Sequence, residues 1–282
     1  MITVGTARIM PIFEVDAGKV IQEGLPDAVP DAIEQVAWLQ PHYADDEGRL
    51  KAQVQAFLVE IDGKKIVVDG CVGDGRERPG LPAWAHLETG FMERFKNVWA
   101  PEEVDIVLCT HMHFDHVGWN TTFVNGQWVP TFPNAQYVFS QVEFDYWNSK
   151  PEKEMADDIM GFEESILPVH AAGLAKFVPS DYKVSVGVSF IPTPGHTPGH
   201  MSILLESEGQ RAVIGGDAVH HPCQIAHPEW GTPFDSDTEQ STTSRRELLE
   251  RFAGTETLFI GSHFANPIAG KIVRDGQGFK LI

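Results

Sequence analysis

The chain carries the sequence Thr110-His111-Met112-His113-Phe114-Asp115-His116-Val117-Gly118, in which three histidines and one aspartate fall within six positions. Histidine and aspartate are poor core residues unless they are paired or bound to a metal, so packing alone does not account for this cluster. Imidazole nitrogens and carboxylate oxygens are good zinc ligands, at roughly 2.0–2.2 Å. The stretch therefore predicts a divalent-metal site rather than a polar loop in which histidines have gathered by chance.

Candidate ligands follow several strand-like segments of the chain. The cluster comes directly after Val104-Asp105-Ile106-Val107-Leu108-Cys109, a short apolar run that is typical of a buried strand. Further along, His196, Asp217 and His263 each follow a segment of the same kind. Open α/β sheets place their sites at the carboxyl ends of strands, so we expect these residues to converge on one site.

Composition narrows the classes of function. The 282 residues include 40 acidic and 21 basic side chains, for a net charge of -19, and 42% of the residues are hydrophobic. An acidic surface repels nucleic acid and anionic membranes, so we expect a small-molecule ligand that is neutral or cationic. Three cysteines predict no disulfide framework, and neither a signal peptide nor a membrane span is recognisable. The expected compartment is the cytoplasm.

The first part of the chain predicts a strand, an arm and a hairpin. Residues 1–12 favour a strand that is ended by Pro11, and residues 14–50 are expected to be irregular. A long irregular segment predicts a peripheral N-terminal arm that acts as a lid or a dimer contact, and a simple surface wrap is equally compatible. Residues 55–69 predict a hairpin that turns at Asp62-Gly63.

The second part predicts alternating helices and strands. Apolar residues at helical spacing over 155–166 predict one core-facing stripe, and residues 184–192 predict a single strand. Ser244 and Glu247 have the spacing of a capping box at the start of a helix. Since hairpins begin both halves of the chain, the pattern predicts two sheets face to face with helices outside.

In the order of these motifs the chain resembles the metallo-β-lactamase superfamily from about Gln53 to His263. The resemblance implies an α/β (α+β) fold, an αββα sandwich of two mixed sheets with helices outside, as a single domain over 1–282. It also implies two metal ions, expected to be zinc, with manganese, cobalt or iron as alternatives. The implied metal ligands are His111, His113 and His196 at the first ion, Asp115, His116 and His263 at the second, and Asp217 between them.

Other features select among the groups of this superfamily. True metallo-β-lactamases lack a bridging aspartate at the position of Asp217, ribonuclease relatives carry a large insert, and glyoxalase II enzymes have a long helical tail. Lactonases that open acyl-homoserine lactones and phosphotriesterases resembling methyl parathion hydrolase remain. Such lactonases usually place a tyrosine three residues after the bridging aspartate, where this chain has His220.

The expected function is a dinuclear zinc-dependent hydrolase that opens a neutral, fairly apolar lactone or ester through a metal-bridging hydroxide. Asp115 and His220 are the expected catalytic residues. A phosphotriester hydrolase is the main alternative. A mononuclear iron persulfide dioxygenase and a non-catalytic ligand-binding protein are less favoured, because no ligand of the family pattern is missing.

Aromatic residues in loops beside the ligand motifs are candidates for an apolar substrate wall. Packing of these loops on the sandwich explains such residues equally well. The residues predicted to bind substrate are Trp119, Phe123, Trp230 and Phe264, and Phe234 also lies in a loop next to a ligand motif. Trp84, in a proline-flanked loop, is a separate candidate for the wall of a pocket, and a core-facing helix is the alternative for its segment. We expect a small-molecule substrate, no nucleic acid or membrane partner, and possible assembly as a homodimer.

Overall fold

The structure is a computed structural model that describes all of residues 1–282, and it contains two seven-stranded mixed sheets. The strands of the first sheet, in spatial order, are β1 (Ile2–Val4), β2 (Ala7–Asp16), β3 (Gln53–Ile61), β4 (Lys64–Val68), β5 (Ile106–Leu108), β8 (Gln136–Ser140) and β9 (Ala175–Val178). The strands of the second are β10 (Lys183–Ser185), β11 (Val188–Pro192), β12 (Met201–Ser207), β13 (Gln210–Ile214), β14 (Leu258–Ile260), β15 (Ala269–Asp275) and β16 (Gly278–Leu281). Parallel pairing occurs along β4, β5, β8 and β9 and between β13 and β14.

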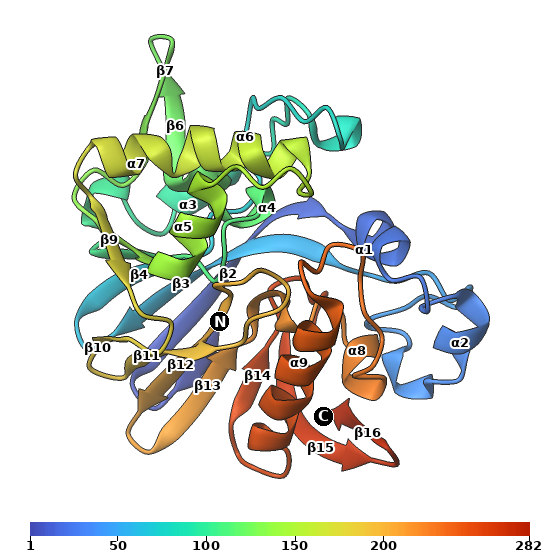
Figure 1. Ribbon diagram of the computed structural model, residues 1–282. Helices are drawn as coiled ribbons and strands as arrows, with labels where there is room; N and C mark the ends of the chain where they lie inside the picture. The colour runs from blue at the N-terminus through green and yellow to red at the C-terminus, as the bar shows by residue number, and fades with distance from the viewer.

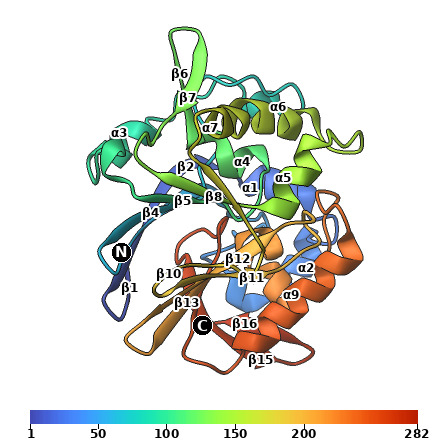
Figure 2. The same ribbon diagram turned by 60° about the vertical axis from the view of Figure 1, so that its left-hand side comes forward.

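Most of the helices lie on the outer sides of the two sheets, as Figures 1 and 2 show. Those over the first sheet are α3 (Phe91–Lys96), α4 (Phe114–Val117), α5 (Gln141–Asn148), α6 (Ala156–Ser165) and α7 (Leu167–Ala171). Those beside the second sheet are α8 (Cys223–Ala226) and α9 (Thr238–Phe252). This arrangement confirms the predicted αββα sandwich. No helix is both long enough and apolar enough to cross a membrane.

Strand β3 shows why the two layers form. Phe57, Val59 and Ile61 point to one side of the strand and share a buried cluster with residues of β12 such as Ile203. The intervening Leu58 belongs to the other buried cluster, which includes the apolar side chains of the covering helices. Side chains of a strand alternate between its faces, so a strand covered on both faces reads as a nearly continuous apolar run.

The predicted end of the first strand at Pro11 is wrong, because β2 continues through this residue to Asp16. Pro11 pairs in register with Phe57 of β3. On its other side β2 pairs with β1 only as far as Ile9. Beyond Ile9 no strand pairs with this side of β2, so a residue without an N–H does not interrupt a ladder there.

The expectation that residues 14–50 are irregular is also wrong. This segment contains the end of β2, the helices α1 (Gly18–Gly24) and α2 (Pro30–Glu34), and a short 3-10 turn. Ile33 and Leu39 are fully buried in the main core cluster, so these residues are integral to the domain. The role of residues 14–50 as a lid or a dimer contact stays a prediction.

Three further local predictions have different outcomes. The hairpin at Asp62-Gly63 is confirmed, and both residues adopt positive φ angles, of 50° and 72°. Residues 184–192 form two strands instead of one, because the chain turns at Gly187, which has a φ of 72°.

Helix α9 begins earlier than predicted, because its N-cap is Asp237, whose side chain accepts from Gln240 N at 3.0 Å. Ser244 lies inside this helix, and its hydroxyl donates to the Pro194 carbonyl at 2.6 Å.

Candidate metal centre

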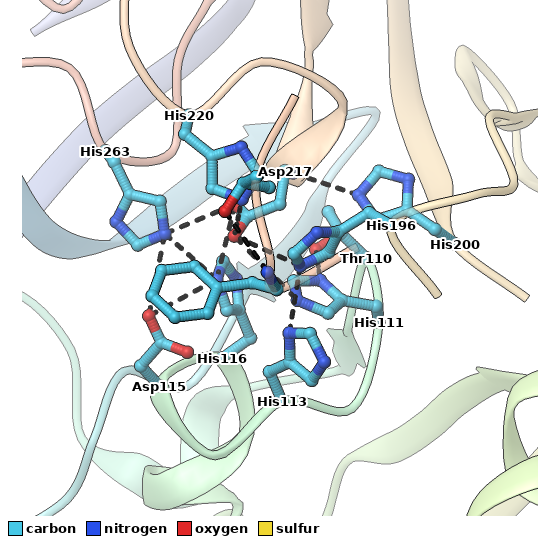
Figure 3. Close-up of polar contacts among 12 residues, drawn as sticks. Thr110, His111, His113, Asp115, His116, His196, His200, Asp217, His220 and His263 are labelled. Atoms are coloured by element: carbon cyan, nitrogen blue, oxygen red, sulfur yellow. Dashed lines mark hydrogen bonds and ion pairs between the residues drawn. The ribbon is translucent and has the colours of Figure 1, made fainter. Parts of the chain in front are cut away.

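Four loops bring the seven predicted ligand side chains together in the cleft between the sheets (Figure 3). Each loop leaves the carboxyl end of a strand, namely β5, β11, β13 or β14. The loop after β5 supplies four of the residues, and the other three loops supply one each. The set comprises His111, His113, Asp115, His116, His196, Asp217 and His263, of which all but the half-buried Asp115 are buried. The strand-end rule therefore placed these residues correctly.

The first group of donor atoms surrounds one point near His196. His113 Nδ1 lies 2.9 Å from His196 Nε2. Asp217 Oδ2 lies 3.5 Å from His196 Nε2 and 3.9 Å from His111 Nε2. Ligands held at about 2.0–2.1 Å around a tetrahedral zinc ion are roughly 3.3 Å apart, so these separations have the scale of a metal site. The buried Nε2 of His111 has no hydrogen-bond partner in the protein.

The second group of donor atoms has the same scale. His116 Nε2 lies 3.1 Å from His263 Nε2. Asp115 Oδ2 is 3.7 Å from the first of these nitrogens and 3.6 Å from the second. Asp217 Oδ1 is 3.4 Å and 3.2 Å from the same two nitrogens. Four donors thus surround a second point.

The side chain of Asp217 joins the two groups. Its Oδ2 faces the first group and its Oδ1 faces the second, and the residue is 3% exposed. Burial lowers the pKa of His111 and of His196 well below the usual range, so both imidazoles are neutral and keep a lone pair for a cation. This donor set fits a pair of divalent cations that share one carboxylate.

Acidic side chains orient two of these imidazoles through their second ring nitrogen. His116 Nδ1 lies 3.0 Å from Asp69 Oδ2, and His196 Nδ1 lies 3.0 Å from Asp235 Oδ1. Such hydrogen bonds set the ring orientation and raise the basicity of a ligand histidine. Neither aspartate was predicted as a site residue. Asp69 directly follows β4, so the strand-end rule would have found it, whereas Asp235 lies in a loop without such a signal.

The buried carboxylate of Glu143 ties two ligand loops to α5. Its Oε1 accepts from Met112 N at 3.0 Å, and its Oε2 accepts from Gly199 N at 2.9 Å. The indole N–H of Trp147 also donates to Oε1, at 2.8 Å. A Cβ at position 199 would lie 2.4 Å from Glu143 N, so glycine is required for this close approach. Sequence reasoning missed Glu143, which lies on a helix far from every ligand motif in the sequence.

His200 and His220 contact Asp217 in different ways. His200 Nε2 accepts from the backbone N of Asp217 at 2.9 Å, so this ring holds the bridging residue in place. His220 Nε2 lies 3.3 Å from Asp217 Oδ2, and neither ring nitrogen of His220 has a hydrogen-bond partner. Burial lowers the pKa of His220 to about 3, so the imidazole is neutral at pH 7 and carries one N–H. Figure 3 shows His220 directly beside Asp217.

A cavity of about 400 Å³ opens above the ligands. Its floor includes the side chains of Asp115, Asp217 and His220. Its wall is mainly apolar and comes from α1, the loop before α3, α4, the start of α6 and the loop before α9. The apolar wall residues are Val20, Ile21, Leu81, Trp84, Phe114, Met155, Pro233 and Phe234. Such a cavity accommodates a small, largely apolar molecule.

None of the four aromatic residues predicted to bind substrate belongs to the lining of this cavity. Trp119 is buried, stacks on Phe91 at 5.4 Å and donates its indole N–H to Glu14. Phe123 is 57% exposed on the hairpin of β6 (Thr121–Val124) and β7 (Gln127–Pro130).

Trp230 and Phe264 pack against other residues of the sandwich. Trp230 stacks on His227 at 4.2 Å, and Phe264 is fully buried against Phe259. Proximity in the sequence to a ligand does not decide where a side chain points. Trp84 lies farther from the ligand motifs in the sequence, yet it lines the cavity together with Phe234.

Family comparison agrees with the fold. Residues 50–263 match the model of the metallo-beta-lactamase superfamily, and the chain belongs to this superfamily. An N-acyl homoserine lactonase from Bacillus sp is 33% identical over 177 residues, which cover 58% of this chain and 63% of the lactonase. The chain thus aligns with less than two thirds of the length of that relative.

Solved structures share the fold over the whole chain. Hydrolase AbOPH of the beta lactamase superfamily is 26% identical, with a TM-score of 0.79 over 100% of this chain and 95% of AbOPH. AidC, a dizinc quorum-quenching lactonase in complex with a product, is 21% identical, with a TM-score of 0.76 over 100% of this chain and 95% of AidC. The likeness to AidC supports the fold alone.

Proposed function

We propose that this protein is a dinuclear zinc hydrolase that opens a neutral, fairly apolar lactone or ester. The observation that carries the proposal is the position of Asp217, whose two oxygens face two separate groups of imidazole nitrogens. The mainly apolar wall of the cavity supports a neutral substrate of low polarity. The names of the aligned relatives support a lactone, since they are N-acyl homoserine lactonases.

Divalent cations bound at the seven ligands would supply Lewis-acid polarisation of a carbonyl oxygen and activation of water. The protein's own carboxylate at Asp115 lines the cavity and keeps 17% of its side chain exposed. It is placed to accept a proton from an attacking water and to pass that proton to the leaving oxygen of the opened ring. The apolar wall holds the substrate over this floor and limits the entry of further water.

His220 is placed to bind the oxygen of the scissile carbonyl. Its ring lines the cavity and has no hydrogen-bond partner in the protein. A preorganised N–H at this position stabilises negative charge as it develops on the oxygen. In this role His220 replaces the tyrosine that acyl-homoserine lactonases usually have three residues after the bridging aspartate.

A phosphotriester hydrolase is the second candidate. The presence of His220 in place of tyrosine favours it, because the donor that faces the substrate differs from that of the acyl-homoserine lactonases. The same ligand set suits a neutral phosphoryl centre, since two cations held there would stabilise attacking and leaving oxygens alike.

Metal analysis joined to a hydrolysis panel tests the proposal. The purified protein is analysed for zinc, manganese, cobalt and iron, and is then assayed against lactones, aryl esters and phosphotriesters at equal concentration. Two zinc ions per chain with the highest kcat/KM on lactones are expected. The highest kcat/KM on phosphotriesters would transfer the conclusion to the second candidate. A single iron without hydrolysis of any substrate would refute both.

A further inference from the structure

A close contact between α1 and the loop before α9 shapes one side of the cavity. Phe234 lies in this loop, is half-buried and lines the cavity. Gly24, the last residue of α1, is buried against the edge of the Phe234 ring. A Cβ at position 24 would lie 2.2 Å from Cε2 and 2.9 Å from Cζ of this ring, which is closer than two carbon atoms can pack. Position 24 therefore has no room for a side chain while the ring keeps its place.

The backbone of Gly24 does not itself require glycine. This residue belongs to a helix, and its φ angle is not positive. Apart from proline, glycine is the least favourable residue in a helix, so its helical position does not account for it either. The feature of the structure that does account for a glycine here is the approach of the Phe234 ring.

The backbone that carries Phe234 is tied to one of the ligand loops. Ser236 N donates to the carbonyl of His196 at 2.9 Å, and Asp235 Oδ1 lies 3.0 Å from Nδ1 of the same histidine. The backbone N of Phe234 also donates to Thr232 Oγ1 at 3.2 Å. A larger residue at position 24 would therefore displace the ring of Phe234 rather than the loop.

The cavity is the space into which this ring can move. The ring stands between α1 and the cavity, because it contacts Gly24 and also belongs to the cavity lining. To reach an ordinary carbon–carbon contact with a new Cβ, the ring would have to retreat by about 1 Å or more. Such a shift narrows a cavity of about 400 Å³ on the side of Phe234.

We propose that Gly24 is a positioning residue for substrate selection, which keeps the Phe234 ring against α1 so that the cavity accepts a long aliphatic substituent. This inference rests on the proposed function and deepens it, because it names neutral lactones or esters with a long alkyl chain as the preferred substrates. Each methylene that packs on the apolar wall should raise kcat/KM by up to about fourfold.

The experiment compares two neutral lactones that differ only in chain length, γ-ethyl-γ-butyrolactone and γ-hexyl-γ-butyrolactone. If only esters are hydrolysed, an aryl butanoate and the matching octanoate replace them. Hydrolysis is measured for the wild type, Gly24→Ala, the double variant Gly24→Ala/Phe234→Leu, and Gly231→Ala. The readout is the ratio of kcat/KM for the long substrate over the short one, which does not depend on the fraction of folded enzyme.

Gly231→Ala is the matched control, since Gly231 lies in the same loop as Phe234. A Cβ at position 231 would lie 2.3 Å from Cγ2 of Thr238, so this replacement also crowds one side chain. Neither Gly231 nor Thr238 lines the cavity. The control therefore separates crowding of the loop from displacement of the ring, and it should keep the wild-type ratio.

The wild type should prefer the hexyl lactone by about 10- to 100-fold, because the added methylenes pack on the wall. Gly24→Ala should lower this ratio by about tenfold, mainly through a higher KM for the hexyl lactone, since the contact is made in both the ground state and the transition state. Phe234→Leu in the double variant removes the displaced ring and should bring the ratio back to within about threefold of the wild type. An unchanged or higher ratio in Gly24→Ala, no recovery in the double variant, or a wild type without preference for the long chain would overturn the proposal.

Two additional measurements cover a variant that does not fold and a protein that does not hydrolyse these substrates. If thermal unfolding shows that Gly24→Ala is not folded, the double variant should fold, because its conflict with the ring is removed; a double variant that is also unfolded would refute the role of Gly24. The ring-opened products of the lactone pair are titrated by calorimetry against the purified protein. If no lactone or ester is hydrolysed, the proposed function fails. In that case a preference for the long product that Gly24→Ala lowers supports the positioning role, and equal affinities refute it.

Discussion

At the floor of the cavity, four of the seven ligand candidates come from one stretch of six residues, whereas the wall comes from five separate segments between Val20 and Phe234. Further hydrogen bonds hold this part of the site: Asp69 contacts the ring of His116, and Glu143 accepts from backbone N–H groups of two ligand loops. Wall residues such as Met155 are held by packing alone, and Met155 is 38% exposed. We therefore expect substitutions in the floor to alter whether the reaction occurs, and substitutions in the wall to alter which molecule reacts.

Replacing Asp217 by alanine should have the largest effect, because one carboxylate faces both groups of donors. We expect the metal content per chain to fall and hydrolysis to drop by more than about a thousandfold, since both cations lose a ligand at once. Elemental analysis and steady-state kinetics on the same preparation measure the two changes. A variant with full metal content and full rate would show that Asp217 does not bridge.

Replacing His220 by alanine should be the next largest change, since it removes the proposed donor without removing a ligand. The expected loss in kcat is roughly ten- to a thousandfold, with metal content unchanged. His220→Tyr should recover part of the rate and shift preference toward homoserine lactones. Loss of a metal from His220→Ala would instead identify His220 as a ligand, and an unchanged kcat on every substrate would exclude a catalytic role.

Replacing Glu143 by glutamine should weaken the floor indirectly. An amide offers only one acceptor oxygen, so one of the loops held through Met112 N and Gly199 N would face an NH2 group. We expect metal affinity to fall by about 10- to 100-fold in competition with a chelator. Glu163→Gln is the matched control, because Glu163 pairs with Lys150 on the surface. Equal affinities of the two variants would show that Glu143 serves folding alone.

Replacing Trp84 by alanine should have the smallest effect of the four and should act on the wall. KM for an apolar lactone should rise about tenfold with kcat nearly unchanged, because the contact is made in both the ground state and the transition state. Phe123→Ala is the control, since Phe123 is exposed on the β6–β7 hairpin. A larger rise in KM from Phe123→Ala than from Trp84→Ala would reverse the assignment of the wall.

The sandwich and the convergence of the seven ligand candidates are predictable from the amino-acid sequence. Strands covered on both faces read as apolar runs, as in β3, and a ligand directly after such a run must lie at the carboxyl end of its strand. The hairpin at Asp62-Gly63 is equally local, because a two-residue turn requires positive φ at both positions. These features depend on neighbours within a few positions, so they are visible in a single sequence.

Which residues line the cavity, and which carboxylates accept hydrogen bonds from the protein, depends on the tertiary structure. Trp119 and Phe264 are neighbours of ligand motifs, yet both point into the core, while Trp84 and Phe234 reach the cavity from segments about 150 residues apart. Asp157 and Asp158 are adjacent and chemically identical, but only Asp158 faces the cavity. Side-chain direction on a helix rotates by about 100° per residue, and the packing of that helix, which no local pattern encodes, selects the residue that lines the cavity.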